Sequence, residues 1–154
     1  MSKISLRVYG LLINEQQQVL VSDEYIRGNY YTKFPGGGLE FGEGLRDGLK
    51  REFQEELRLH VEVQDHLYTT DFFQQSAFNP DYQIVSVYYQ VKALEPIQVP
   101  LREKPFDYDA EQLAVYASAQ QIESFRLIDW HNFSSESVSL PIDKLVADLL
   151  KKKK

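Results

Sequence analysis

The chain has 154 residues, 43% of them hydrophobic, so it is long enough to bury one core and short for two domains. It contains no cysteine, which excludes disulfides, thiolate metal sites and cysteine nucleophiles. The formal net charge of −6 means that the protein as a whole attracts an anionic ligand poorly. We expect a single domain over residues 1–150 and a lysine tail over residues 151–154. No stretch has the pattern of a signal peptide or a membrane span, which predicts a cytoplasmic protein with no membrane partner.

Apolar and β-branched runs predict most of the regular structure. The predicted strands are Ile4–Ile13, one opening at Val19, Tyr30–Phe34, Val61–Phe73, Gln83–Ala93 and Phe125–Ile128. The polar turn Asn14–Gln18 predicts that the first two strands form a hairpin. Strands on both sides of one crossover helix indicate an α/β fold with a mixed sheet.

The last third of the chain has weaker signals. Three prolines within Leu94–Asp109 predict a loop or an irregular edge, and Ser118–Ile122 is expected to be a short turn. Ser139–Leu150 is predicted to be a closing helix that starts near Pro141. The lysines that follow, Lys151–Lys154, could bind nucleic acid. Lysines that end an amphipathic helix more often balance its dipole in solvent, so no nucleic-acid partner is predicted.

The segment from about Gly44 to Leu57 is predicted to be an amphipathic helix with carboxylates along one flank. Each helical residue advances roughly 100°, which places Leu45, Leu49, Phe53 and Leu57 in one apolar stripe and Asp47, Lys50, Gln54 and Arg58 opposite it. Glu52, Glu55 and Glu56 are related by i, i+3 and i, i+4 spacing and lie beside the stripe. The three acids are therefore expected at the margin of the core.

Two interpretations of these acids remain open at this point. Like charges at i, i+4 repel by a few tenths of a kcal/mol, and a hard cation such as Mg²⁺ or Mn²⁺ would remove the conflict. Alternatively, Lys50 and Arg51 could pair with Glu55 on an ordinary charged surface. The preceding Pro35 and Gly36–Gly38 favour a ligand site, because such a loop can turn backbone groups toward a ligand.

These residues carry a family resemblance. Gly37, five residues, Glu43, seven residues, then Arg51-Glu52-Phe53-Gln54-Glu55-Glu56 resembles the Nudix box of the Nudix hydrolases, whose pattern is G-x5-E-x7-R-E-U-x-E-E-x-G-U with U a bulky apolar residue. Leu59 fills the last apolar position. The one departure is Arg58, which stands where the family has a glycine that ends the helix in a left-handed conformation.

The resemblance implies an α/β/α sandwich with a mixed sheet, and a loop, helix and loop that bind Mg²⁺ or Mn²⁺. By this resemblance Glu52 and Glu56 would be direct metal ligands, and the Gly36 carbonyl would be a backbone ligand. Glu55 would be a further ligand or would orient a metal-bound water. All three glutamates would be catalytic.

A structural role is implied for the remaining residues of the motif. Gly37 would shape the loop, and Glu43 and Arg51 would connect the loop to the helix through a salt bridge. A general base could also come from a later loop, and the acids there are Glu95, Glu103, Asp107, Asp109 and Glu111. Their spacing selects none of them.

The reaction implied is hydrolysis of a pyrophosphate bond in a nucleoside diphosphate linked to another moiety. Candidate substrates are ADP-ribose or a similar nucleotide sugar, a nucleoside triphosphate or a dinucleotide. The alternative is a catalytically silent Nudix-fold sensor that binds such a nucleotide. Three clustered carboxylates favour catalysis, since a binding module has no need of them. The sequence also leaves a homodimer open.

Overall fold

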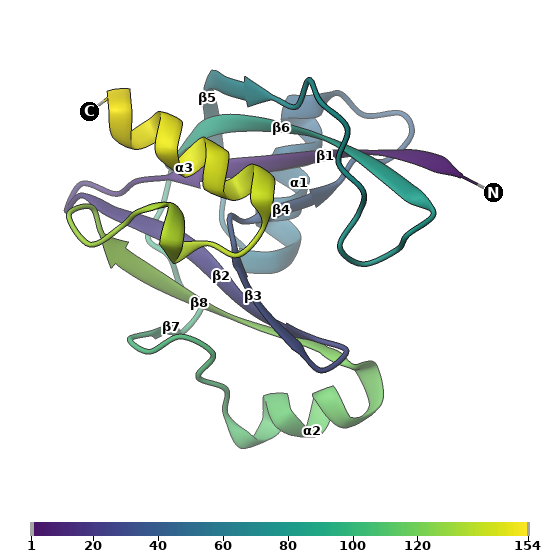
Figure 1. Cartoon of the computed structure of the whole chain (residues 1–154). Coiled ribbons are helices and arrows are strands. Elements are labelled where there is room, and N and C mark those ends of the chain that lie inside the picture. The colour runs from purple at the N-terminus through teal and green to yellow at the C-terminus, as the bar shows by residue number, and fades with distance from the viewer. Residues whose placement is uncertain (1, 154) are drawn as a thin grey trace. The chain divides into compact units, whose positions relative to one another are not determined.

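The computed structural model describes residues 2–153, and the chain divides into two compact units (Figure 1). The first unit comprises residues 1–13 and 35–98, and the second comprises residues 14–34 and 99–154. Each unit contains one four-stranded sheet; α1 belongs to the first unit, and the other helices described below belong to the second. That residues 1–150 form a single domain stays a prediction.

The sheet of the first unit has the strand order β4-β1-β6-β5. Its elements are β1 (Lys3–Leu12), β4 (Gly36–Gly38), β5 (Val61–Thr69) and β6 (Tyr82–Ala93). Strand β1 runs parallel to β6 and antiparallel to β4, and β5 pairs antiparallel with β6, so the sheet is mixed. Helix α1 (Leu45–Leu57) contacts β1, β4 and β5. The predicted α/β class with a mixed sheet is confirmed.

Helix α1 buries the apolar stripe that its spacing predicts. Leu49, Phe53 and Leu57 are completely buried, and Leu45 at the first turn is half-buried. The opposite side is exposed, with Asp47, Lys50, Gln54 and Arg58 in solvent. Burying a side chain the size of Leu or Phe contributes about 1.5 to 3 kcal/mol, so this stripe is what attaches the helix to its sheet.

Helix α1 ends at Arg58 in the left-handed conformation that a glycine usually supplies. Arg58 has φ 50° and ψ 39°, and its backbone N–H donates to the Gln54 carbonyl at 3.0 Å. The N–H of Leu59 reaches back to the Phe53 carbonyl at 3.4 Å. The helix therefore ends where the Nudix pattern places its glycine, although a side chain with a Cβ occupies that position.

We expect Arg58→Gly to stabilise the protein by about 0.5 to 1 kcal/mol. Relief of the left-handed strain, about 1 to 2 kcal/mol, outweighs the larger conformational entropy of glycine in the unfolded chain. Urea unfolding of wild type, Arg58→Gly and Arg58→Ala measures this. Arg58→Ala removes the same side chain but keeps the Cβ, so equal stabilisation by both variants would contradict the explanation.

The sheet of the second unit has the strand order β3-β2-β8-β7. Its strands are β2 (Gln18–Ile26), β3 (Asn29–Lys33), β7 (Leu101–Arg102) and β8 (Gln121–Asp129). The predicted hairpin of Ile4–Ile13 with the strand opening at Val19 is wrong, because β1 and β2 belong to different sheets. The hairpin partner of β2 is β3. Arg27 and Gly28 have φ 47° and 83°, the positive values that a tight two-residue hairpin turn requires.

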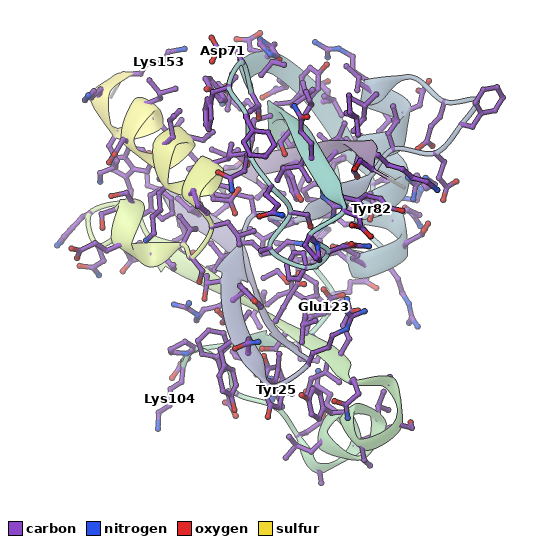
Figure 2. The ribbon with its side chains drawn as sticks, turned by 45° about the vertical axis from the view of Figure 1, so that its right-hand side comes forward. Tyr25, Asp71, Tyr82, Lys104, Glu123 and Lys153 are labelled. Carbon is purple, nitrogen blue, oxygen red and sulfur yellow. The ribbon has the colours of Figure 1, made fainter. Side chains whose placement is uncertain are left out.

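Helix α2 (Ala110–Ala119) has no counterpart among the predicted elements. The predicted turn Ser118–Ile122 is wrong, since these residues end α2 and begin β8. None of the side chains of α2 is buried, so the helix packs no apolar stripe into a core. The helix contacts the sheet through Tyr116, whose ring stacks on that of Tyr25 with the two ring centres 4.0 Å apart (Tyr25 is labelled in Figure 2). The Asp109 side chain caps the helix and accepts from the Gln112 N–H.

The chain closes with η1 (Ser135–Ser137) and α3 (Pro141–Lys153). The predicted closing helix is present, but it extends beyond Leu150 through the lysines. The Lys151 ammonium donates to the Trp130 carbonyl at 2.6 Å and lies 4.3 Å from the centre of its ring. The lysines therefore form the last turn of α3, and Lys154 lies outside the described residues. Among residues 2–153, no helix combines the length and apolar character of a membrane span.

Candidate active site

The candidate site lies in the first unit, where β4 leads through a loop into α1. Gly36 has φ +147°, and a Cβ there would collide with the backbone of β1 at the Val8 carbonyl. A Cβ on Gly37 would lie 2.6 Å from a carboxylate oxygen of Glu52. Gly36 therefore permits the pairing of β4 with β1, and Gly37 leaves the space that the Glu52 carboxylate occupies.

Arg51 is the centre of the site, because every nitrogen of its guanidinium donates to the loop or to α1. Its Nη2 donates to Glu43 Oε1 at 2.7 Å and to the Gly38 carbonyl at 3.0 Å, and its Nε donates to Glu43 Oε2 at 3.0 Å. Its Nη1 faces the helix and contacts Glu52 at 3.2 Å and Glu55 at 3.1 Å. One side of the guanidinium thus fastens the loop, and the other neutralises two helix carboxylates.

A tight turn over residues 40–43 presents Glu43 to this arginine. The backbone N–H of Glu43 donates to the Glu40 carbonyl at 3.4 Å, and Gly42 has φ +93°, which fits the third position of a type II turn. Glu43 Oε1 also accepts from the Glu40 N–H at 2.9 Å. These bonds, with Arg51 the largest contribution, lower the pKa of Glu43 from 4.5 to about 2. They also raise the pKa of Arg51 above its usual value.

The lowered pKa of Glu43 predicts an acid-sensitive contribution to stability. A carboxyl whose pKa is lower in the folded state stabilises the fold fully above its unfolded pKa of about 4.5. That contribution is lost as the pH falls from about 4.5 to about 2. We expect the difference in unfolding free energy between wild type and Glu43→Gln to be constant above pH ~6 and to shrink through this window. Urea unfolding across the pH series measures it, and a difference that persists at pH ~2 would contradict the prediction.

The three candidate metal ligands differ in exposure. The Glu52 side chain is 14% exposed and lies against Gly37, while that of Glu55 is 55% exposed. Glu56 is half-buried on the same side of α1. Within residues 2–153, no three Asp, Glu or His side chains are gathered around one point where a metal ion could bind. In this conformation Arg51 pairs with Glu52 and Glu55 instead.

The donor set nevertheless fits a hard divalent cation. Three carboxylates within one turn of a helix, and a backbone loop without side chains opposite Glu52, offer the oxygen ligands that Mg²⁺ and Mn²⁺ prefer. The chain has no thiolate, and its histidines lie outside this site. The site therefore lacks the sulfur and imidazole ligands that softer metals prefer.

The candidate bases from the later loops have structural partners or belong to the second unit. Glu95 accepts from the backbone N–H of His60 and contacts its ring at 2.8 Å, and these bonds lower the pKa of Glu95. Asp109 caps α2. Glu103, Asp107 and Glu111 are exposed side chains of the second unit. Of these acids, only Glu95 lies in the unit that contains α1.

Glu40 also belongs to the site, although the Nudix motif does not predict it. Its carboxylate lies 3.5 Å from Arg51 Nη1, and its backbone closes the turn that carries Glu43. The signal available in the sequence was Glu40-Phe41-Gly42-Glu43, four residues with glycine at the third position. Read as a turn, this segment would have placed Glu40 beside Glu43.

Comparisons with known proteins agree with this geometry. The NUDIX domain model matches residues 3–137 and thus includes segments of both units. A NUDIX hydrolase from Nitrosomonas europaea has a similar structure, with TM-score 0.64 and 18% identity over 97% of this chain and 72% of that chain. A MutT protein from Methanosarcina mazei Go1 has TM-score 0.67 and 14% identity over 99% and 97% of the two chains. No curated protein matches the sequence.

An ADP-ribose pyrophosphatase from Streptococcus suis is also similar, with TM-score 0.57 and 14% identity over 97% of this chain and 92% of that one. At such low identities the solved structures show a common fold. The family model covers most of the chain and includes the loop and helix around Arg51. The chain therefore belongs to the Nudix family of pyrophosphate-bond hydrolases.

Proposed function

We propose that this Nudix hydrolase uses Mg²⁺ or Mn²⁺ to cleave the pyrophosphate of a nucleoside diphosphate linked to another moiety. The substrate class includes ADP-ribose and similar nucleotide sugars, nucleoside triphosphates and dinucleotides. Water attacks one phosphorus of the pyrophosphate, and the other phosphate departs with the bridging oxygen. The observation that carries the proposal is the set of carboxylates on α1, with Glu52 against Gly37 and Arg51 beside it.

The family resemblance implies a role for each carboxylate. Glu52 and Glu56 would bind the metal through their carboxylate oxygens, and the Gly36 carbonyl would be a backbone ligand. Glu55 is a further ligand or accepts the proton of the attacking water, and its exposure makes it accessible to that water. The chemistry that a bound Mg²⁺ or Mn²⁺ supplies is neutralisation of phosphate charge and activation of water.

Arg51 and Glu43 have a positioning role in this proposal. The bidentate contact between them anchors the loop that follows β4, the strand of Gly36 and Gly37, to the helix that carries the glutamates. The loop and the helix are thereby held together before any ion binds.

The names of structural relatives support a nucleotide substrate. One relative is a UDP-X diphosphatase, and another is an ADP-ribose pyrophosphatase. These proteins share the fold with this chain at 15% and 14% identity. The group attached to the nucleotide therefore has to be found by experiment.

The test is turnover on a substrate panel with and without divalent metal. The panel contains ADP-ribose, a UDP-sugar, the nucleoside triphosphates and a dinucleoside polyphosphate, each with Mg²⁺, Mn²⁺ or EDTA. We expect release of a nucleotide product from at least one compound, and complete loss of release in EDTA. Running the reaction in ¹⁸O-labelled water identifies the phosphorus that is attacked.

Two outcomes would redirect the proposal. Tight metal-dependent nucleotide binding with no turnover on any compound would favour the catalytically silent sensor. Neither binding nor turnover on any compound would contradict both functions.

A further inference from the structure

A groove of about 370 Å³ lies in the first unit, at the end of the sheet where β1 and β6 begin. Three segments form it side by side, because Lys3 pairs with Tyr82 in the parallel ladder and Gln75 bridges to Gln83 (Tyr82 is labelled in Figure 2). The backbone N–H of Lys3 also donates to the Asp81 carbonyl at 3.0 Å. Several hydrogen bonds thus connect the segments that line the groove.

The groove is bordered by apolar side chains that the fold leaves in solvent. Ile4 is 65% exposed and Phe73 is 70% exposed, and both line the groove. Two further exposed apolar side chains neighbour them in the chain but do not line the groove: Leu6, two residues after Ile4 and therefore on the same face of β1, is 45% exposed, and Phe72 is 41% exposed. Exposed apolar side chains gathered in one place mark an interaction surface, whereas single ones are ordinary.

One charge of each sign also lines the groove. Lys3 and Asp81 are exposed, and among residues 2–153 neither side chain makes an ion pair or a side-chain hydrogen bond. The groove is thus self-complementary, with a hollow beside a projecting phenyl ring and a cation beside an anion. A two-fold axis requires this kind of surface, because each residue i then contacts residue j of the partner and the reverse.

We propose that two copies of this chain associate through this groove. Phe73 of each copy enters the groove of the other, and Lys3 of each copy pairs with Asp81 of the other. Few side chains line the groove, so the dimer exchanges with the monomer, with a dissociation constant on the order of 10 µM. The interface is separate from the carboxylates of α1 and depends on no catalytic activity.

Sedimentation velocity over about 1 to 200 µM protein tests the proposal, since this range spans the expected dissociation constant. We expect wild type to shift from monomer to dimer over this range. Lys3→Glu and Asp81→Lys should each weaken association by at least about 10-fold, because each places like charges opposite one another. The double variant Lys3→Glu with Asp81→Lys restores the opposite charges and should recover most of the association.

Phe73→Ser should also weaken association by at least about 10-fold, since it removes the central aromatic anchor. Phe41→Ser is the matched control, because Phe41 is fully exposed in the same unit but lies outside the groove. It should leave the dissociation constant unchanged. The proposal is overturned if wild type stays monomeric throughout, if Phe41→Ser weakens association as much as Phe73→Ser, or if the charge-swapped double variant does not recover.

Discussion

Replacing Glu56 with glutamine is expected to lower kcat by at least about 100-fold while the protein stays folded. Glutamine has the shape of glutamate but offers a neutral oxygen, so it removes a charged ligand from the proposed Mg²⁺ or Mn²⁺ site. We expect the concentration of metal needed for half-maximal activity to rise as well. Steady-state kinetics over a metal titration measures both effects, with the substrate found in the panel.

Asp47→Asn is the matched control for Glu56→Gln. It removes one negative charge from the same helix, but Asp47 lies on the exposed side, away from the three glutamates. We expect near wild-type kcat for Asp47→Asn, and a change in unfolding free energy of less than about 1 kcal/mol for both variants. Full activity of Glu56→Gln would show that Glu56 is not a metal ligand. Equal losses in both variants would indicate that helix charge in general, and no specific ligand, supports activity.

Replacing Arg51 with alanine is expected to destabilise the protein by about 1 to 3 kcal/mol. Arg51 is 21% exposed and Glu43 is 16% exposed, so the variant leaves a partly buried carboxylate without its arginine partner. It also removes the donor to the Gly38 carbonyl and returns the repulsion between Glu52 and Glu55. Urea unfolding at neutral pH in EDTA measures the loss without any contribution from metal.

Arg51→Lys separates charge from geometry. Lysine keeps the positive charge but lacks the planar fork that contacts both oxygens of Glu43, so an intermediate loss is expected. A double-mutant cycle of Arg51→Ala with Glu43→Gln should give a coupling energy of about 1 to 3 kcal/mol. Additive effects of the two changes would mean that the contact between Arg51 and Glu43 adds no stability.

Added Mg²⁺ should change the unfolding free energy of wild type and of Glu56→Gln by different amounts. A ligand that binds only the folded state raises its stability by RT ln(1 + [L]/Kd). Wild type should therefore be stabilised by Mg²⁺, and Glu56→Gln should be stabilised much less. This readout is independent of turnover, so it tests the proposed ligand even before a substrate is known.

The parts of the fold that sequence spacing predicted well are those governed by local geometry. Leu49, Phe53 and Leu57 are buried because residues four apart lie on the same side of any α-helix. Strand β6 was equally clear, since a run of β-branched and aromatic residues suits a pleated sheet. These elements needed no information about their neighbours.

The elements that were wrong or missed depended on distant partners. The turn Asn14–Gln18 suggested a hairpin, yet β1 pairs with β6 and β4, and β2 pairs with β8 and β3. Helix α2 buries no side chain and is connected through Tyr116 stacking on Tyr25, a contact between residues far apart in the chain. Neither the choice of strand partners nor the stacking of Tyr116 on Tyr25 leaves a periodic pattern in the sequence.

By itself, the sequence determined which acids share one flank of α1 and that their oxygens suit a hard cation, because helical spacing and ligand chemistry are properties of neighbouring residues. The Nudix resemblance also implied the contact of Glu43 with Arg51, and only the tertiary structure decided that Glu40, Glu52 and Glu55 meet at the same guanidinium. That convergence depends on the pairing of β4 with β1 and on the packing of α1 against the sheet. Both join residues that are distant in the chain, which no local spacing specifies.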